Sequence, residues 1–115
     1  MDARRRPPII TAWSPHAKEL LRSILATIRF EQSAEDAFRW NGKIAKAVET
    51  LDDFPQSGRN IPVACFATIP ENLDNLRQTF CLPYRIVYEV VENEVRVLSI
   101  RHSRMLVSSD DTIWN

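Results

Sequence analysis

The chain has 115 residues, with fifteen basic and fifteen acidic side chains and therefore no net charge. This length predicts one domain over residues 1–115, and the balanced charge argues against a protein that coats nucleic acid indiscriminately. The chain has only two cysteines, and we expect a cytoplasmic protein in which both remain free thiols. No apolar stretch approaches the roughly 20 residues that cross a bilayer, so we expect no membrane contact. Neither Cys nor His recurs at the spacing of metal ligands, and we expect no metal and no cofactor.

The amino-terminal half predicts a strand followed by two helices. Residues 8–13 are β-prone and stop at Ser14-Pro15, where Ser14 can cap a helix that Pro15 opens. A helical apolar stripe follows: Ala17, Leu20, Leu21, Ile24, Leu25 and Ile28. Ser33 begins a second helix that Pro55 ends, with its own stripe: Ala37, Trp40, Ile44, Ala47, Val48 and Leu51. The short link near Glu31 predicts an antiparallel helix hairpin.

The carboxyl-terminal half predicts a long loop and then antiparallel strands. Residues 55–75 contain four proline or glycine breaks, with residues 64–67 as a weak strand candidate. Strands are expected over 76–80, 84–91 and 95–102, with Asn93 supplying the left-handed conformation of the last turn. The predicted fold is α+β, in which these strands form one sheet with the first strand. Residues 9–104 should form the core and 105–115 a polar tail, with the packing of Trp114 left open.

Strand alternation predicts which side chains share a face. It places Tyr84, Ile86 and Tyr88 together and Arg85 on the other face, away from the helices. In the last strand, strict alternation groups Leu98 with Arg96, Ile100 and His102, and groups Ser99 with Val95, Val97 and Arg101. Apolar residues on both sides predict a central strand that is covered on both faces.

The candidate functional site is a set of basic residues expected to gather at one end of the sheet, where they could hold a phosphate: Arg77, Arg85, Arg101, His102 and Arg104. The alternative is that these are ordinary surface residues, with Arg85 paired to Glu89 or to an acidic loop residue. A lone histidine such as His102 is more often structural than catalytic. His16, in the first turn of the first helix, is expected to be an exposed side chain without a special role.

Several short motifs, taken in order, resemble one family: Trp13–Ala17, Leu51–Arg59, Leu76-Arg77, Tyr84–Tyr88 and Val97–His102. Over residues 9–104 the chain resembles the toxin component of RelE/ParE-type toxin-antitoxin modules. The resemblance implies a β-α-α-β-β-β fold and a growth-arresting toxin that a cognate antitoxin neutralises. Fold alone does not determine the target within this superfamily.

The RelE branch implies a ribosome-dependent messenger endoribonuclease. On that interpretation Arg85, His102 and Arg77 are the catalytic candidates. Two positions depart from the RelE pattern, because Ser103 occupies a basic position and Ser108-Ser109 stand where a catalytic tyrosine is expected.

The ParE branch implies inhibition of DNA gyrase without chemistry by the toxin itself, and His102-Ser103-Arg104 resembles the end of its last strand. The neutral charge favours this branch slightly, since affinity for ribosomal RNA depends on phosphate contacts. Arg85 then has a structural or binding role and His102 anchors the strand end. A third alternative is a non-toxic relative that still binds an antitoxin.

Both branches imply that the antitoxin lays a helix and an extended segment over apolar surface between the helix hairpin and the sheet. The residues expected to meet this partner or the target are Arg77, Arg85, Arg101 and Arg104. The oligomeric state is left open.

Overall fold

The computed structural model describes residues 9–115, so the predicted start of the first strand at Pro8 lies outside the described residues. The elements, in chain order, are β1 (Ile10–Trp13), α1 (Pro15–Glu31), α2 (Ala34–Asp53), β2 (Arg59–Asn60), β3 (Leu76–Cys81), β4 (Tyr84–Val91) and β5 (Glu94–His102). Short 3-10 turns lie at Val63–Cys65, Leu73–Asn75 and Ser109–Asp111. The predicted helix hairpin and the predicted α+β fold are confirmed.

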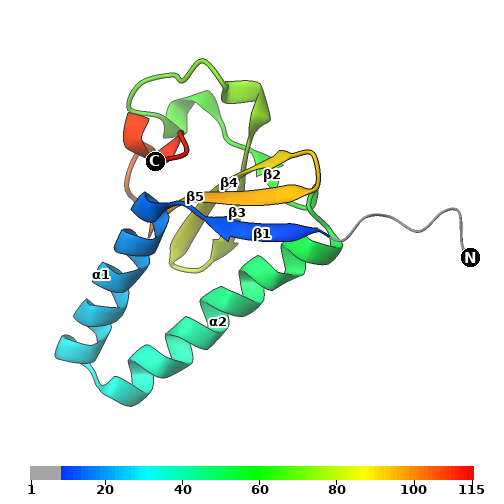
Figure 1. Ribbon diagram of the computed structural model, residues 1–115. Helices are drawn as coiled ribbons and strands as arrows, with labels where there is room; N and C mark the ends of the chain where they lie inside the picture. Colours follow the sequence, from blue (N-terminus) through cyan, green and yellow to red (C-terminus); the bar gives the residue numbers. More distant parts are fainter. Residues whose placement is uncertain (1–8) are drawn as a thin grey trace, which may run out of the picture.

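The strands form one sheet in the order β1-β5-β4-β3-β2. β1 runs parallel to β5, and the other neighbouring pairs are antiparallel. Figure 1 shows the two helices on one side of this sheet, and the loop before β3 together with the carboxyl-terminal segment on the other. β5 is an interior strand and both faces of the sheet are covered, as its sequence predicted.

Each face of the sheet has its own apolar cluster. The helix face packs β4 and β5 against the helices through Ala17, Ile44, Val48, Ile86, Val97 and Ile100. The opposite face packs the loop and the carboxyl-terminal segment through Ile61, Phe66, Leu76, Val87, Leu98 and Val107. The two thiols are free and lie on opposite faces, Cys81 against the first cluster and Cys65 against the second.

A β-bulge in β5 changes the predicted faces of that strand. Val87 pairs with Ser99 but Tyr88 pairs with Val97, so Leu98 is an extra residue without a partner position on β4. Val97 and Ile100 consequently share the helix cluster, whereas Leu98 belongs to the opposite one. The strict alternation assumed from the sequence is therefore wrong for this strand, since one inserted residue reverses the side-chain direction.

Three local predictions in the carboxyl-terminal half are also wrong. Residues 64–67 do not form a strand: Phe66 makes only an isolated bridge to Val107. In the turn between β4 and β5 the left-handed residue is Glu92, with φ of 56°, rather than Asn93. Residues after 104 are part of the core, because Val107, Asp111 and Thr112 are buried.

The caps of both helices are serines, as predicted. Ser14 Oγ accepts the amide of Ala17 at 3.0 Å, and Ser33 Oγ accepts the amide of Asp36 at 3.0 Å. Ser14 is fully buried and its hydroxyl also donates to the Leu98 carbonyl in the bulge, at 3.3 Å. The first cap thus ties α1 to the sheet as well as closing the helix.

We expect Ser14→Ala to lower the free energy of unfolding by about 2 kcal/mol, because it removes a helix cap and leaves a buried carbonyl without its donor. Ser33→Ala, which removes only a cap, should cost about 1 kcal/mol. Urea unfolding followed by circular dichroism measures both values. Equal losses in the two variants would contradict a role for Ser14 beyond capping.

Candidate functional site

The register of β3, β4 and β5 brings most of the predicted basic residues together. Tyr84 pairs with His102 and with Cys81, so these three positions define one end of the sheet. Arg85 lies directly opposite Arg101 on β5, and Arg104 follows in the turn after β5. We call Arg85, Arg101, His102 and Arg104 the basic sheet end.

Arg77 does not belong to this group. It pairs with Tyr88, three residues from Arg85 along β4, which corresponds to about 10 Å. The register also places it on the helix face, opposite to that of Arg85. Arg77 Nη1 donates to the Gly58 carbonyl at 2.8 Å and to the Gln56 carbonyl at 3.3 Å. The prediction that Arg77 joins the cluster is therefore wrong, and its contacts hold the segment that follows α2.

Arg85 is buried without an acidic partner. Its side chain is only 9% exposed and lies on the face opposite the helices, as predicted. Nη2 donates to the Ser103 carbonyl at 3.1 Å, and the guanidinium lies 5.8 Å from the centre of the Phe80 ring. Nε and Nη1 have no hydrogen-bond partner among residues 9–115. The alternative prediction of an ion pair with Glu89 or a loop carboxylate is wrong.

His102 lies on the other face, since the bulge moves it to the side of the helices. Its Nδ1 accepts the amide of Arg104 at 3.1 Å, and its ring meets Tyr84 edge-on at 6.4 Å between centres. This arrangement turns the chain at the end of β5, which is the strand-end role expected under the ParE alternative. His102 and Arg85 therefore project from opposite faces.

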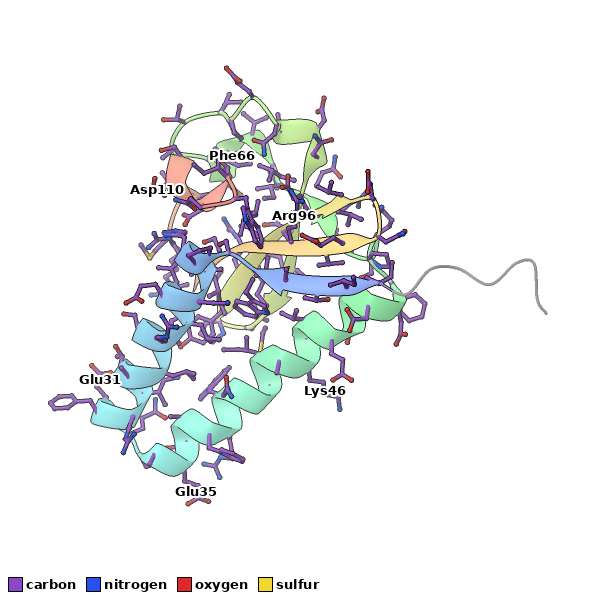
Figure 2. All side chains as sticks on the ribbon, in the orientation of Figure 1. Glu31, Glu35, Lys46, Phe66, Arg96 and Asp110 are labelled. Carbon is purple, nitrogen blue, oxygen red and sulfur yellow. The ribbon has the colours of Figure 1, made fainter. Side chains whose placement is uncertain are left out.

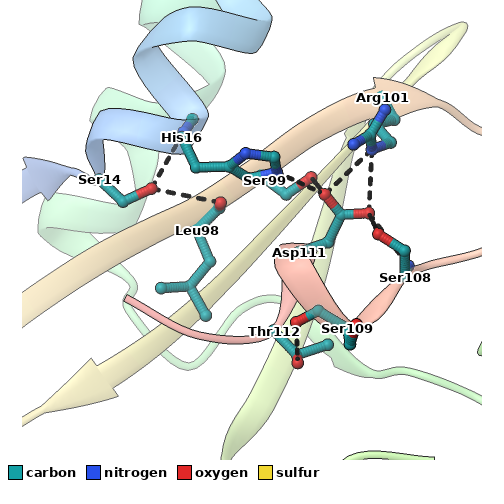
Figure 3. Close-up of polar contacts among 10 residues, drawn as sticks. Ser14, His16, Leu98, Ser99, Arg101, Ser108, Ser109, Asp111 and Thr112 are labelled. Carbon is teal, nitrogen blue, oxygen red and sulfur yellow. Dashed lines mark hydrogen bonds and ion pairs between the residues drawn. The ribbon is translucent and has the colours of Figure 1, made fainter. Parts of the chain in front are cut away.

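Arg101 is held by a carboxylate that the sequence did not reveal. Asp111 is 1% exposed, and Arg101 Nε donates to both of its oxygens, at 3.0 and 2.9 Å. His16 Nε2 donates to Oδ1 at 2.9 Å and Ser99 to the same oxygen at 2.8 Å, while the amide and hydroxyl of Ser108 donate to Oδ2, each at 3.0 Å. Figure 3 shows these donors converging on one carboxylate, which we call the Asp111 clamp.

The clamp corrects the expectation that His16 is an exposed side chain without a role, since the side chain is 19% exposed and anchors the carboxyl-terminal segment to α1. The His16 backbone amide also donates to the Asn115 carbonyl at 2.7 Å. His16 and Asp111 are 95 positions apart in the sequence, so no spacing pattern could connect them. The only local signal was Ser108 three residues before Asp111, a capping pattern that the structure forms.

The surroundings of Asp111 act in opposite directions on its pKa. Burial is the largest influence and by itself raises the pKa, because it disfavours the charged carboxylate. The hydrogen bonds from His16, the Ser108 amide, Ser99 and Arg101 stabilise that charge, and the net result is a pKa below the ordinary value of 3.8. Asp111 is therefore a permanent negative charge at neutral pH and already satisfied by donors, which makes it a structural rather than a reactive carboxylate.

A groove of about 490 Å³ lies between α1 and the basic sheet end. Its apolar wall includes Leu20, Ile24, Ile28, Tyr84, Ile100 and Met105, and its polar rim includes Glu31, Arg101 and His102. Figure 2 places Glu31 at the end of α1 remote from the sheet. The groove thus has an acidic end near the helix turn and a basic end at the sheet.

Within residues 9–115, no group of three or more His, Cys, Asp or Glu side chains is placed to hold a metal ion. None of the helices in this part of the chain is both long enough and apolar enough to cross a membrane.

Comparison with known proteins agrees with this architecture. A family described as the ParE toxin of the parDE type II toxin-antitoxin system matches residues 12–107. The solved chromosomal ParDE system of P. aeruginosa has a similar fold, with a TM-score of 0.64 at 19% identity over 82% of this chain and 95% of that one. The RelBE2 toxin-antitoxin complex of Mycobacterium tuberculosis gives a TM-score of 0.45 at 16% identity, over 85% and 94% of the two chains.

A search of curated proteins found no match to the sequence. The family match covers most of the chain, and its limits include both helices and every strand from β2 to β5. The chain therefore belongs to the ParE family of type II toxin-antitoxin toxins, within the RelE/ParE superfamily.

Proposed function

We propose that this chain arrests bacterial growth by inhibiting DNA gyrase through binding alone, and that a cognate antitoxin neutralises it in the cytoplasm. The observation that carries the proposal is the divergence of the three residues that RelE-type cleavage would use. Arg85 projects from one face of the sheet, whereas Arg77 and His102 project from the other.

Ribose-phosphate cleavage needs a proton acceptor, a proton donor and a charge-stabilising group around one phosphate. Arg85 is 9% exposed, Arg77 is engaged by two backbone carbonyls, and the Nδ1 of His102 is engaged by the Arg104 amide. These positions support a toxin that blocks its target by contact. The neutral chain also suits a protein target better than ribosomal RNA, where phosphate contacts dominate the affinity.

The groove beside α1 supports the proposal of an antitoxin partner. Its apolar wall fits one side of an amphipathic helix, and its oppositely charged ends would orient that helix. The acidic end of the partner helix would then lie near the exposed Arg104, because Arg101 is already paired with Asp111. Of the expected partner-binding residues, Arg104 is the exposed one, and it forms no ion pair within residues 9–115.

Two assays on the purified protein test the choice of target. In a supercoiling assay with DNA gyrase we expect concentration-dependent inhibition, weakened about ten-fold or more by Arg104→Glu because an exposed contact charge is reversed. Lys46→Glu, the same charge change on the exposed surface of α2, should leave inhibition unchanged. With ribosomes programmed with a defined messenger, we expect no protein-dependent RNA ends.

Messenger cuts that disappear in Arg85→Met would instead identify an RNase and overturn the gyrase proposal. A protein that binds its antitoxin but affects neither gyrase nor growth would be the non-toxic relative. Induction of the chain alone in bacteria, with and without the antitoxin, supplies the growth measurement.

A further inference from the structure

Two buried polar side chains lack partners on the face of the sheet opposite the helices. Gln78 is 8% exposed and Arg85 is 9% exposed. Within residues 9–115, Gln78 Oε1 and Arg85 Nε and Nη1 have no hydrogen-bond partner. Arg85 pairs with Phe80, and Gln78 pairs with Val87, so Gln78 and Arg85 are diagonal neighbours across β3 and β4. Buried groups of this kind are normally satisfied, and these two long side chains are close enough for one small ligand to bridge them.

The buried charge on this face is unbalanced. Arg101 lies directly opposite Arg85 on β5, but Asp111 already neutralises it. Residues 55–70, 76–88 and 95–109, which include the strands and loops next to Arg85, contain no acidic side chain. A buried cation without a counter-charge is costly, so one negative charge beside Arg85 would stabilise the folded chain.

A route to these atoms lies beside Phe80. The Phe80 ring covers the guanidinium, with 5.8 Å between the ring centre and the guanidinium carbon of Arg85, yet Phe80 is 42% exposed. A hollow of about 330 Å³ next to it is lined in part by Arg59, Gln78 and Phe80. Arg59 is exposed and makes no ion pair with any residue from 9 to 115. Rotation of one exposed ring would therefore join Arg85 and Gln78 to a hollow whose positive charge attracts anions.

The unpartnered atoms define the chemistry of the ligand. Arg85 offers N–H donors and one positive charge, so the ligand needs an anionic acceptor oxygen. Gln78 Oε1 is an acceptor and needs a donor, which chloride and nitrate do not have. Water can both donate and accept, but it leaves the charge of Arg85 unbalanced. A small oxyanion with its own hydroxyl group meets all three requirements, and bicarbonate is such an ion.

We propose that Arg85 and Gln78 form a binding site for a small oxyanion that carries a hydroxyl group, of the bicarbonate type, and that Phe80 covers the bound ion. An anionic oxygen accepts from an unpartnered N–H group of Arg85, and the hydroxyl donates to Gln78 Oε1. The site involves neither gyrase nor an antitoxin, so its test is independent of the proposed function. Its consequence is a toxin whose stability rises with the concentration of the ion.

Thermal unfolding of the full chain in bicarbonate and in nitrate, at equal concentration, pH and ionic strength, tests the site. Nitrate has the same planar shape and charge as bicarbonate but no hydrogen to donate. At about ten times its dissociation constant, bicarbonate should raise the melting temperature by about 5 °C, because it binds only the folded state. Nitrate should bind about ten-fold more weakly, since it leaves Gln78 Oε1 unpaired. Isothermal titration calorimetry measures both constants, and equal binding of the two ions, or no binding of bicarbonate, would overturn the inference.

Three variants assign the effect to the two side chains. Arg85→Met should abolish the response to bicarbonate, and an unchanged response would overturn the site. Gln78→Leu should bind bicarbonate and nitrate equally, and a retained ten-fold preference would overturn the role of Gln78 even if Arg85→Met fails to fold. Lys46→Met removes the same charge from the exposed surface of α2 and should respond as the wild type does. Stabilisation by a short RNA but not by bicarbonate would overturn the assignment to a small free ion.

Discussion

Gly58→Ala should lower the free energy of unfolding by about 3 kcal/mol, at the upper end of what an overpacked core costs. A Cβ at Gly58 would lie 2.3 Å from the Tyr88 hydroxyl oxygen and 2.7 Å from the Gln78 carbonyl oxygen. The hydroxyl oxygen belongs to the fully buried Tyr88 side chain and the carbonyl oxygen belongs to the backbone of β3, so moving either atom away would disturb the packed core. Tyr88 is fully buried, and its hydroxyl accepts the Gly58 amide and donates to the Pro55 carbonyl, each at 2.9 Å.

The chain contains only one other glycine, which provides a matched control. A Cβ at Gly42, inside α2, would meet nothing within 4 Å. Gly42→Ala should therefore stabilise the protein by about 0.5–1 kcal/mol through helix propensity. Urea unfolding monitored by circular dichroism measures both variants. Opposite signs are expected, and a Gly58→Ala protein as stable as the wild type would contradict the close packing of this segment against Tyr88.

Asp111→Ala should lower the free energy of unfolding by about 3–5 kcal/mol, the range for removing one partner of a buried ion pair. It deprives Arg101, His16, Ser99 and Ser108 of their common acceptor and releases the carboxyl-terminal segment from β5 and α1. Asp110→Ala removes the neighbouring, exposed carboxylate and should change stability by less than about 0.5 kcal/mol. A loss for Asp111→Ala as small as that for Asp110→Ala would show that the clamp contributes nothing.

The same residue makes stability depend on acid. The pKa of Asp111 is lower in the folded protein than its ordinary value of 3.8, so the folded state favours the carboxylate form. Its contribution is complete above that ordinary pKa and is lost as the pH falls through the folded pKa. The difference in unfolding free energy between the wild type and Asp111→Asn should therefore be constant above about pH 5 and shrink below about pH 4. A difference that is the same at pH 3 and pH 7 would contradict this linkage.

If the clamp behaves in this way, the carboxyl-terminal segment is part of the folded toxin and not an appendage. Trp114 also packs on the sheet, because the guanidinium carbon of Arg96 in β5 lies 5.5 Å from the centre of the Trp114 ring. Arg101 is then neutralised within the chain, whereas Arg59, Arg85 and Arg104 make no ion pair within residues 9–115.

The sequence alone predicted the elements whose causes are local. Serine caps, Pro15 and the three- and four-residue apolar spacing define both helices within a few neighbouring residues, and Pro55 ends the second. The order of short motifs along the chain was sufficient to identify the superfamily. The face of Arg85 also followed from simple alternation, and Arg85, Arg101, His102 and Arg104 lie at one end of the sheet as predicted, although Arg85 and His102 project from opposite faces.

Only the tertiary structure decided the relations that depend on residues far apart in the chain. The bulge at Leu98 reverses the faces of β5, and nothing near residue 98 in the sequence marks it. The pairing of Arg77 with Tyr88 separates it from Arg85, and His16 finds Asp111 across 95 positions. Register and buried polar contacts arise because distant segments must satisfy each other's hydrogen bonds in one packed core, whereas helices and turns arise from neighbouring residues, which a sequence displays directly.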